Sequence, residues 1–363
     1  MKLIPLAFAV ILSLSIIMVA VDNHNANRGG TPSAVSYESH APITITGDIG
    51  FTGNNSSTGI SWGNGTESNP YIIKGWKINA AGNATAILIS ASLFSTVHFK
   101  IMNCHLSNAT DSDIQLRFAN HGQLLNNNCT GAGKEGVLLF HCTNCILFNN
   151  ICTDNVNYGI HLTDSDGTEI SNNYCANNGL GGSNENSPES GILIDVYSSR
   201  NNITSNTLYH NWIGIRVASN STLNNISYNN CSTNEEFGLR IASISKENTI
   251  WNNTFYKNNG AGSTYNPANI QASDTVGNNS WNTSGSPHGY GNWWSDWTTP
   301  DGNGDGIVDW PYNITVSTGA KDYYPLTTKP LPPFIPEFGS MVVPIGGIIF
   351  MMLFVMKKMD RRR

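Results

Sequence analysis

The sequence predicts an all-β fold, a parallel β-helix (solenoid) with a C-terminal capping module and hydrophobic segments at both termini. Two patterns predict the solenoid: a four-residue motif that recurs about every 23 residues, and an Asn-rich motif that follows it. Period-two alternation and a repeat too short for helical pairs indicate coils of three short strands. One coil cannot bury its apolar face alone, so the coils must stack.

The first motif is Gly followed by apolar, any and apolar residues, as in Gly159-Ile160-His161-Leu162. The apolar residue after Gly falls at positions 137, 160, 192, 215 and 239, in steps of 23, 32, 23 and 24 residues, and Ile114 fits one step earlier. The long step contains the polar run Gly179–Asn184, which predicts a protruding loop.

The second motif is Asn-x-Ile-x-x-Asn, and it begins at Asn201, Asn224 and Asn248. Asn adopts left-handed turns readily, and its amide can hydrogen-bond from coil to coil. These motifs therefore predict the turns that flank a second strand.

The register resembles that of right-handed β-helix proteins of the carbohydrate-binding and sugar-hydrolase (CASH) type, NosD-like proteins in particular, from about Ile43 to Leu326. The resemblance implies a right-handed coil. Such repeats specify a fold and leave the function open.

The C-terminal part, Gly291–Trp297, Asp301–Asp309 and Asp322–Leu326, resembles the block that ends NosD-like proteins of archaeal surfaces. The last coil of a β-helix has an exposed core that must be covered. We expect the bulky side chains of Trp293, Trp294 and Trp297 to cover it.

The same module contains oxygen ligands at the spacing of a calcium loop, Asp301, Asn303, Asp305 and Asp309. Tyr312 stands where an EF-hand has Glu, so only a simpler calcium loop fits, completed by Asp296 or Asp322. The alternative is a turn satisfied by its own backbone.

Composition and the chain ends predict an extracellular protein. The net charge is −6 and only 12% of residues are charged, which disfavours a nucleic-acid partner. An apolar run near the N-terminus predicts a secretory signal, with an uncleaved anchor as the alternative. Sequons predict a glycoprotein, among them Asn64, Asn83, Asn108, Asn202, Asn225, Asn252 and Asn313.

The charge-free run Phe338–Met356 is long enough to cross a membrane, and the basic tail after it favours the cytoplasmic side. Pro336, Glu337 and Phe338, with the apolar run and the Arg tail, resemble archaeal PEF-type sorting signals. That resemblance implies an archaeosortase as a partner, and a plain membrane anchor is the alternative.

The domains expected are a signal peptide (1–26), linker (27–40), β-helix (41–282), capping module (283–326), Pro-rich linker (327–337), transmembrane or sorting helix (338–356) and cytoplasmic tail (357–363).

The cysteines share a column with apolar residues. Cys129, Cys152, Cys175 and Cys231 interchange with Leu208 and Phe255, which predicts an inward, buried position. A disulfide between coils is a second interpretation. Cys142 and Cys145 form a lone C-x-x-C, for which we prefer substitution within the repeat, or a local disulfide, over a metal or redox site.

The residues between the apolar positions of the first strand should point outward. One such column holds Gln115, Leu138, His161, Leu193, Arg216 and Arg240, and the next holds Arg117, Phe140, Thr163, Asp195, Ala218 and Ala242. The stacked Arg216 and Arg240 need an anion or Asp195 to balance their charge. Arg117, Arg216 and Arg240 are the candidate ligand-binding residues, and a sugar carboxylate suits guanidinium groups.

These observations favour a cell-surface protein that binds a polysaccharide or another envelope component without catalysis, or that has a structural role there. A polysaccharide lyase or epimerase acting on acidic glycans is the alternative, with His161, Asp195, Arg216 and Arg240 as candidate catalytic residues. Hydrolysis needs two opposed carboxylates, and only Asp195 is well placed. A copper-system role is a further alternative that rests on the NosD-like resemblance alone.

Overall fold

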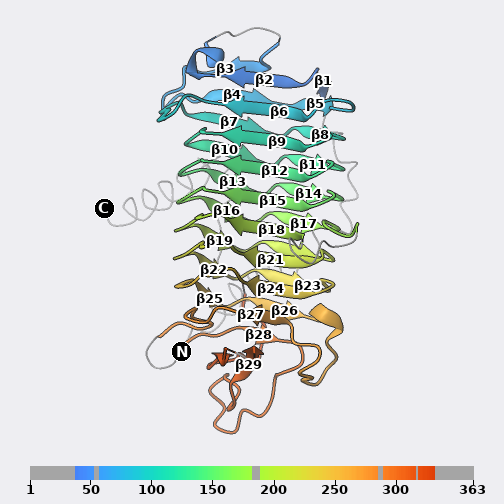
Figure 1. Ribbon diagram of the computed structural model, residues 1–363, viewed down its shortest axis with the longest axis vertical. Coiled ribbons are helices and arrows are strands. Elements are labelled where there is room, and N and C mark those ends of the chain that lie inside the picture. The colour runs from blue at the N-terminus through green and yellow to red at the C-terminus, as the bar shows by residue number, and fades with distance from the viewer. Residues whose placement is uncertain (1–36, 53–56, 182–188, 285–288, 316–317, 332–363) are drawn as a thin grey trace, which may run out of the picture.

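The computed structural model describes residues 37–52, 57–181, 189–284, 289–315 and 318–331. In this part of the chain the coils stack along one axis, from the N-terminal coil at one end to a C-terminal module at the other (Figure 1). The strands form three long, mostly parallel sheets, and no α-helix occurs among the described residues. The predicted all-β parallel solenoid is thereby confirmed.

Each coil contributes one strand to each sheet, in the chain order B, C, A. Sheet B is β2 (Ile43–Thr46), β6 (Thr85–Ser90), β9 (Ser112–Arg117), β12 (Glu135–Phe140), β15 (Tyr158–Thr163), β18 (Ser190–Asp195), β21 (Ile213–Val217), β24 (Phe237–Ile241) and β27 (Ala272–Asp274). Sheet C is β3 (Ile60–Trp62), β4 (Tyr71–Lys74), β7 (Phe99–Met102), β10 (Gly122–Leu125), β13 (Ile146–Phe148), β16 (Glu169–Ser171), β19 (Asn202–Thr204), β22 (Asn225–Ser227) and β25 (Thr249–Trp251). Sheet A is β1 (Glu38–Ser39), β5 (Trp76–Asn79), β8 (His105–Ser107), β11 (Asn128–Thr130), β14 (Ile151–Thr153), β17 (Tyr174–Ala176), β20 (Thr207–Tyr209), β23 (Asn230–Ser232), β26 (Thr254–Tyr256) and β28 (Trp293–Trp294).

Two 3₁₀ turns, Asp48–Phe51 and Asn258–Gly260, and a small antiparallel pair complete the described elements. The pair consists of β29 (Tyr312–Thr315) and β30 (Ala320–Asp322) in the C-terminal module.

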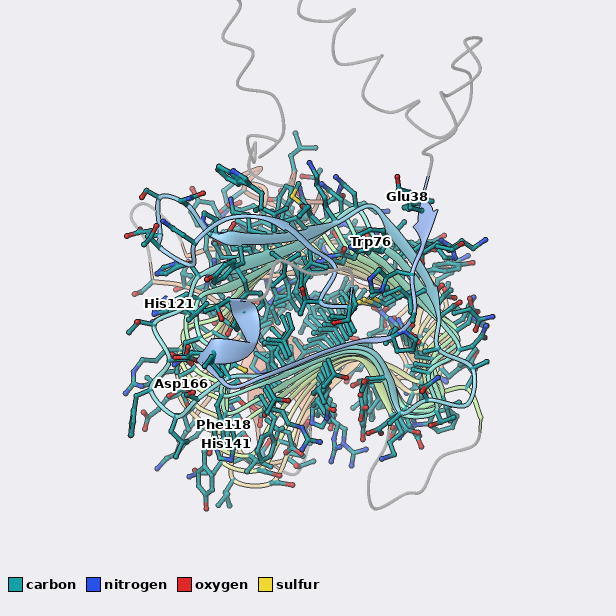
Figure 2. The ribbon with its side chains drawn as sticks, turned by 90° about the horizontal axis from the view of Figure 1, so that it is seen from above. Glu38, Trp76, Phe118, His121, His141 and Asp166 are labelled. Carbon is teal, nitrogen blue, oxygen red and sulfur yellow. The ribbon has the colours of Figure 1, made fainter. Side chains whose placement is uncertain are left out.

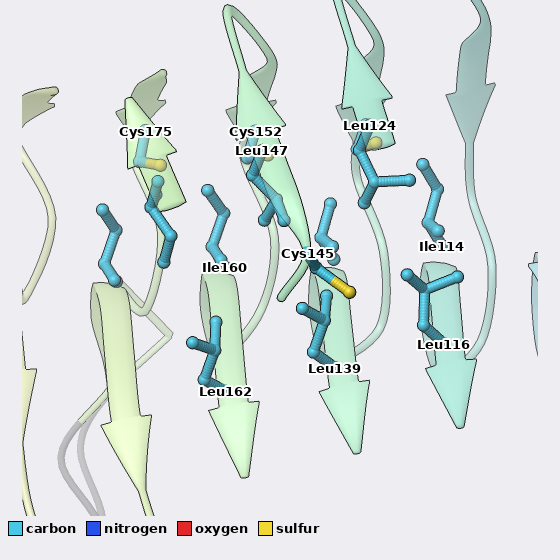
Figure 3. Close-up of a cluster of buried hydrophobic side chains, with 14 of the residues drawn as sticks. Ile114, Leu116, Leu124, Leu139, Cys145, Leu147, Cys152, Ile160, Leu162 and Cys175 are labelled. Atoms are coloured by element: carbon cyan, nitrogen blue, oxygen red, sulfur yellow. The ribbon is translucent and has the colours of Figure 1, made fainter. Parts of the chain in front are cut away.

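The core is a set of apolar columns that run through all coils. Ile160 and Leu162 of β15 lie between their counterparts on β12 and β18, and Leu147 faces them from sheet C (Figure 3). Cys129, Cys152 and Cys175 stack in register on sheet A and are fully buried, as the sequence predicts. All seven cysteines are buried and free. The thiols therefore act as small apolar groups.

Buried Asn side chains tie each turn to the next coil. Asn173 Nδ2 donates to the carbonyl of Leu147 at 2.8 Å and to Oδ1 of Asn206 at 3.0 Å, while its own Oδ1 accepts from the backbone N–H of Asn150 at 2.9 Å. The two predicted Asn columns both form such ladders. A third ladder, which the motif analysis did not identify, lies at the turn from sheet A to sheet B and contains Asn155, Asn178, Asn211, Asn234 and Asn258.

The last coil is covered by stacked rings. Trp294 packs between Phe255, at 4.3 Å between ring centroids, and Tyr312, at 3.9 Å. Asp322 Oδ2 accepts from Trp294 Nε1 at 3.0 Å, and burial raises the pKa of Asp322 to about 7.

Trp297 packs against the core cluster as expected, but the expectation that Trp293 also covers the core is wrong. Successive residues of a strand face opposite sides, so Trp293 next to the buried Trp294 points outward. There it stacks on Tyr256 beneath Lys329. Trp297 packs edge-on against Tyr312 at the rim of the cap and stays partly exposed.

The predicted signal peptide, most of the first linker, Pro336–Phe338 and Phe338–Met356 lie outside the described residues. Within the described ranges, no helix has the length and apolar character needed to cross a membrane.

Candidate functional site

The outer face of sheet B has the register that the sequence predicts. His161 of β15 pairs with Leu138 on one side and Leu193 on the other, and Arg216 pairs with Leu193 and Arg240. Thr163 pairs with Asp195 in the second column. The candidate residues His161, Asp195, Arg216 and Arg240 thus lie within four consecutive coils, on β15, β18, β21 and β24.

Arg117 does not join them. It is exposed on β9, four coils from Arg216 on β21, which corresponds to about 19 Å at the strand spacing of a sheet. A short ligand over Arg216 and Arg240 therefore does not reach Arg117.

The face is far less open to solvent than an outward column suggests. Arg216 is 9% exposed, Leu193 1% and Gln115 4%. A third outward column, at the start of each strand, packs beside the first: Thr85, Ser112, Glu135, Tyr158, Ser190, Ile213 and Phe237. The Gly motif does not include this column, although its members directly precede the residue in the Gly position.

Two residues of the third column contact His161. Its Nδ1 lies 3.7 Å from Glu135 Oε1, and its ring centroid lies 5.0 Å from that of Tyr158. The hydroxyl of Ser112 donates to Glu135 Oε2 at 2.6 Å and holds the carboxylate in place. The side chains of His161 and Glu135 are 16% and 7% exposed, so water screens this pair weakly. The group can accept and donate protons and hydrogen bonds.

Carboxylates from the same face balance the stacked arginines. Arg240 Nη1 donates to both oxygens of Glu236, at 3.1 and 3.3 Å. Burial lowers the pKa of Arg216, and Tyr158 and Asp195 partly oppose this effect. Burial also raises the pKa of Glu189, which the positive charge of Arg216 counteracts. Carboxylates of the protein itself therefore balance the charges of Arg216 and Arg240.

Several buried polar atoms of this face make no hydrogen bond to the described part of the protein. They are both ring nitrogens of His161, Glu189 Oε2, Ser190 Oγ, Asp195 Oδ1 and Arg240 Nε. An unsatisfied buried polar group costs about 1–3 kcal/mol, so such groups are rare in native proteins unless something else satisfies them.

The loop proposed for calcium is held by its own backbone. Asp301 Oδ1 accepts from the N–H groups of Gly304 and Asp305, its Oδ2 accepts from Gly306, and Asp309 Oδ2 accepts from Gly302. Asp305 Oδ1 accepts from Ile307, and its Oδ2 accepts from the Asn303 amide.

The two residues expected to complete the calcium loop lie elsewhere. Asp322 is buried against Trp294, and Asp296 accepts from Gln271 at 2.6 Å. Among the described residues, no group of three or more His, Cys, Asp or Glu side chains could hold a metal ion. Calcium binding at this loop stays a prediction that a calcium titration would test.

The family model for the right-handed β-helix region matches residues 37–194, which agrees with the parallel coils described above. The described part of the chain is a parallel β-solenoid, and residues 37–194 of it match the right-handed β-helix region. No curated protein shows significant similarity to it.

Solved β-helix structures resemble this chain at low identity. The A-module of the mannuronan C-5 epimerase AlgE4 of Azotobacter vinelandii is 11% identical, with a TM-score of 0.37 over 63% of this chain and 75% of that one. Pectate lyase Pel9A is 12% identical, with a TM-score of 0.43 over 76% and 84%. The enzymatically active domain of tailspike protein 2 of bacteriophage CBA120 is 14% identical, with a TM-score of 0.41 over 56% of this chain and 35% of that one.

Proposed function

We propose that this protein binds an extended polysaccharide across the outer face of sheet B. The observation that carries the proposal is the run of ionisable side chains on the outer face of successive coils, Glu135, His161, Asp195, Arg216 and Arg240. Coils repeat at about 4.8 Å, so a linear ligand can meet equivalent positions on one coil after another.

The charges favour a neutral, hydroxyl-rich glycan over a densely acidic one. Four carboxylates, Glu135, Glu189, Asp195 and Glu236, lie on this face with two arginines. Because Glu236 already occupies the Arg240 guanidinium, a sugar carboxylate would have to displace it. Vicinal hydroxyls can instead donate to the carboxylates and accept from the guanidinium groups.

A glycan array probed with the full chain tests the proposal. We expect binding to neutral extended glycans and a loss of binding in His161→Gln and Arg240→Ala. Tyr174→Ala is the matched control, because Tyr174 is exposed on the outer face of sheet A, away from the site. No binding to any glycan, or equal binding by all variants, would disprove the proposed site.

The second candidate function is a lyase or epimerase on acidic glycans. The contact of His161 with Glu135 favours it, since a carboxylate beside an imidazole suits a general base. The test is incubation with uronate polymers, with absorbance of the unsaturated product and NMR of the sugar ring as readouts. Absence of both products would leave binding as the function of this face.

The cellular setting is part of the same proposal. We infer a cell-surface location, with Phe338–Met356 as the membrane segment or, through Pro336-Glu337-Phe338, as a substrate of an archaeosortase. Mass spectrometry of the native C-terminus distinguishes a retained membrane segment from one that an archaeosortase has removed. The NosD-like relationship also stays a proposal. A copper-system role rests on that resemblance alone, and copper binding of millimolar affinity or weaker would end it.

A further inference from the structure

The turn that leads from sheet B to sheet C is longer after β18, β21 and β24 than in the three coils directly before them, after β9, β12 and β15. After β12 and β15 a single residue, His141 or Asp164, adopts a positive φ before the next buried position of the turn. After β18, β21 and β24 two residues do so: Val196 and Tyr197, Ser219 and Asn220, Ser243 and Ile244. Because these turns stack in register, the added residue forms a step along this corner of the solenoid.

The choice of residues at this step is costly. Val196 has a φ of 46°, Tyr197 of 59° and Ile244 of 58°. The left-handed region costs residues with a side chain roughly 1–2 kcal/mol, and β-branched residues are rarest there. At the turn from sheet C to sheet A the same conformation is given mostly to Asn, at Asn103, Asn126, Asn149, Asn172 and Asn252.

The strained residues present their side chains to solvent. Tyr197 is 61% exposed, Ile244 69% and Val196 38%. Ser219 and Asn220, on the coil between them, are half-buried. The backbone fixes the spacing, because Tyr197 N–H donates to the Ser219 carbonyl and Asn220 N–H to the Ser243 carbonyl, both at 2.9 Å. The result is a hollow of about 250 Å³ lined by these six turn residues.

The chemistry of the hollow is apolar at its two ends and polar in the middle. Val196 and Tyr197 stand two coils from Ile244, which corresponds to about 10 Å, and this gap admits one ring in van der Waals contact with both walls. The polar groups of Ser219 and Asn220 lie on the coil between them, and the Ser243 hydroxyl lies beside Ile244. A pyranose matches this arrangement, because its C–H faces are apolar and its rim carries hydroxyls. An aromatic side chain of a protein partner would leave the polar groups of the middle coil without hydrogen bonds.

We infer that the hollow formed by Val196, Tyr197, Ser219, Asn220, Ser243 and Ile244 is a subsite for a single hexopyranose unit. It is continuous with the outer face of sheet B, since Asp195 ends β18 and Val196 follows it directly. The inference deepens the proposed function and rests on it for the class of ligand. The subsite would hold a branch or a terminal sugar of the glycan.

Saturation-transfer NMR with the full chain and a panel of methyl hexopyranosides tests the subsite without the polymer. We expect saturation transfer from the wild type to at least one glycoside. Tyr197→Ala should lose affinity roughly tenfold, the size expected for removal of one ring contact, and Tyr197→Phe should keep the wild-type affinity. Phe94→Ala is the matched control, because Phe94 is 92% exposed with a positive φ at the same corner, outside the hollow. Tyr197→Asn, which suits the left-handed turn, guards against a folding effect.

The outcomes separate the two proposals. If both Tyr197→Ala and Tyr197→Asn lose glycoside binding while the wild type binds no polymer, the result supports the subsite and contradicts the proposed site on the outer face of sheet B. Polymer binding that depends on His161 while glycosides bind Tyr197→Ala as they bind the wild type overturns the subsite and leaves the face. No transfer to any glycoside overturns the subsite as well. Binding to phosphatidylglycerol vesicles that falls equally in Tyr197→Ala and Phe94→Ala would mark the corner as a lipid-binding edge and overturn the inference.

Discussion

Nδ1 of His161 lies 3.7 Å from Oε1 of Glu135, on the outer face of the neighbouring strand. The pair is largely shielded from solvent, and Ser112 fixes the carboxylate. Neither residue belongs to the core, so packing alone does not require the pair. We therefore regard it as the centre of the proposed site.

The first prediction concerns the coupling of this pair. Glu135→Gln keeps an acceptor for Ser112 but removes the charge beside His161. We expect glycan affinities of Glu135→Gln, His161→Gln and the double variant to be non-additive, with a coupling of about 0.5–3 kcal/mol for residues in contact. Calorimetric titration of the same oligosaccharide measures it. Additive losses would mean that the two residues act separately.

The second prediction concerns the charge of the ligand. Glu236→Gln releases the Arg240 guanidinium from its carboxylate partner. We expect the variant to bind uronate polymers several-fold more tightly than the wild type, and more so at low salt, because a freed cation attracts anions that salt screens. Affinity for neutral glycans should change little. Preferential binding of uronates by the wild type would show that Glu236 does not control the charge preference.

The third prediction tests the Asn ladders. Asn206 donates to Ile170 O and Asn229 Oδ1 and accepts from Asn173, all within the buried ladder. Asn206→Ala leaves buried partners unsatisfied at about 1–3 kcal/mol each, so we expect a clearly lower free energy of unfolding in denaturant titrations. Asn230→Ala is the control, since Asn230 is exposed on sheet A and its loss should stay within about 0.5 kcal/mol. Equal stability of the two variants would contradict the structural role of the ladder.

The fourth prediction concerns pH. Asp113 points into the core at a position where later coils have Gly, is 0% exposed, and burial raises its pKa to about 8. A carboxyl with a raised folded-state pKa stabilises the fold fully below its unfolded pKa of about 3.9, and this contribution is lost as pH rises through the folded value.

We therefore expect Asp113→Asn to show a smaller fall in Tm between pH 4 and pH 8 than the wild type. At alkaline pH the Tm of the variant should be higher by several degrees, since 1 kcal/mol corresponds to roughly 2–4 °C. A smaller decline should remain, because the pKa of the buried Asp322 is raised to about 7. Parallel Tm curves for wild type and variant would show that Asp113 is not the titrating group.

The sequence is enough to predict the solenoid, because one register explains every coil. The spacing of Ile160, Ile192 and Ile215 places His161, Leu193 and Arg216 in one outward column, and the pairing of the strands confirms it. Cys152 interchanging with Leu208 was likewise sufficient to predict its burial.

Features of the site that depend on the turns could not be predicted from the repeat motifs. Glu135 lies before the Gly position, outside the strict alternation of the strand, so its proximity to His161 required the bend at Gly136. The hollow beside Tyr197 depends on an added residue in the turn after β18, which the ordinary step of 23 residues from Ile192 to Ile215 does not reveal. Both Trp293 and Trp294 were expected in the cap because bulky aromatic residues can cover an exposed core. Strand alternation decides which of the two neighbours faces inward, and it is Trp294.

The most direct test is calorimetric titration of the full chain with the neutral oligosaccharide that the glycan array identifies, beside the His161→Gln and Tyr174→Ala variants. The proposed site predicts saturable binding by the wild type, a loss of at least about tenfold in His161→Gln, the size expected for a buried polar contact, and wild-type affinity in Tyr174→Ala. Equal affinities for wild type and His161→Gln, or a loss confined to Tyr174→Ala, would contradict a glycan site on the outer face of sheet B.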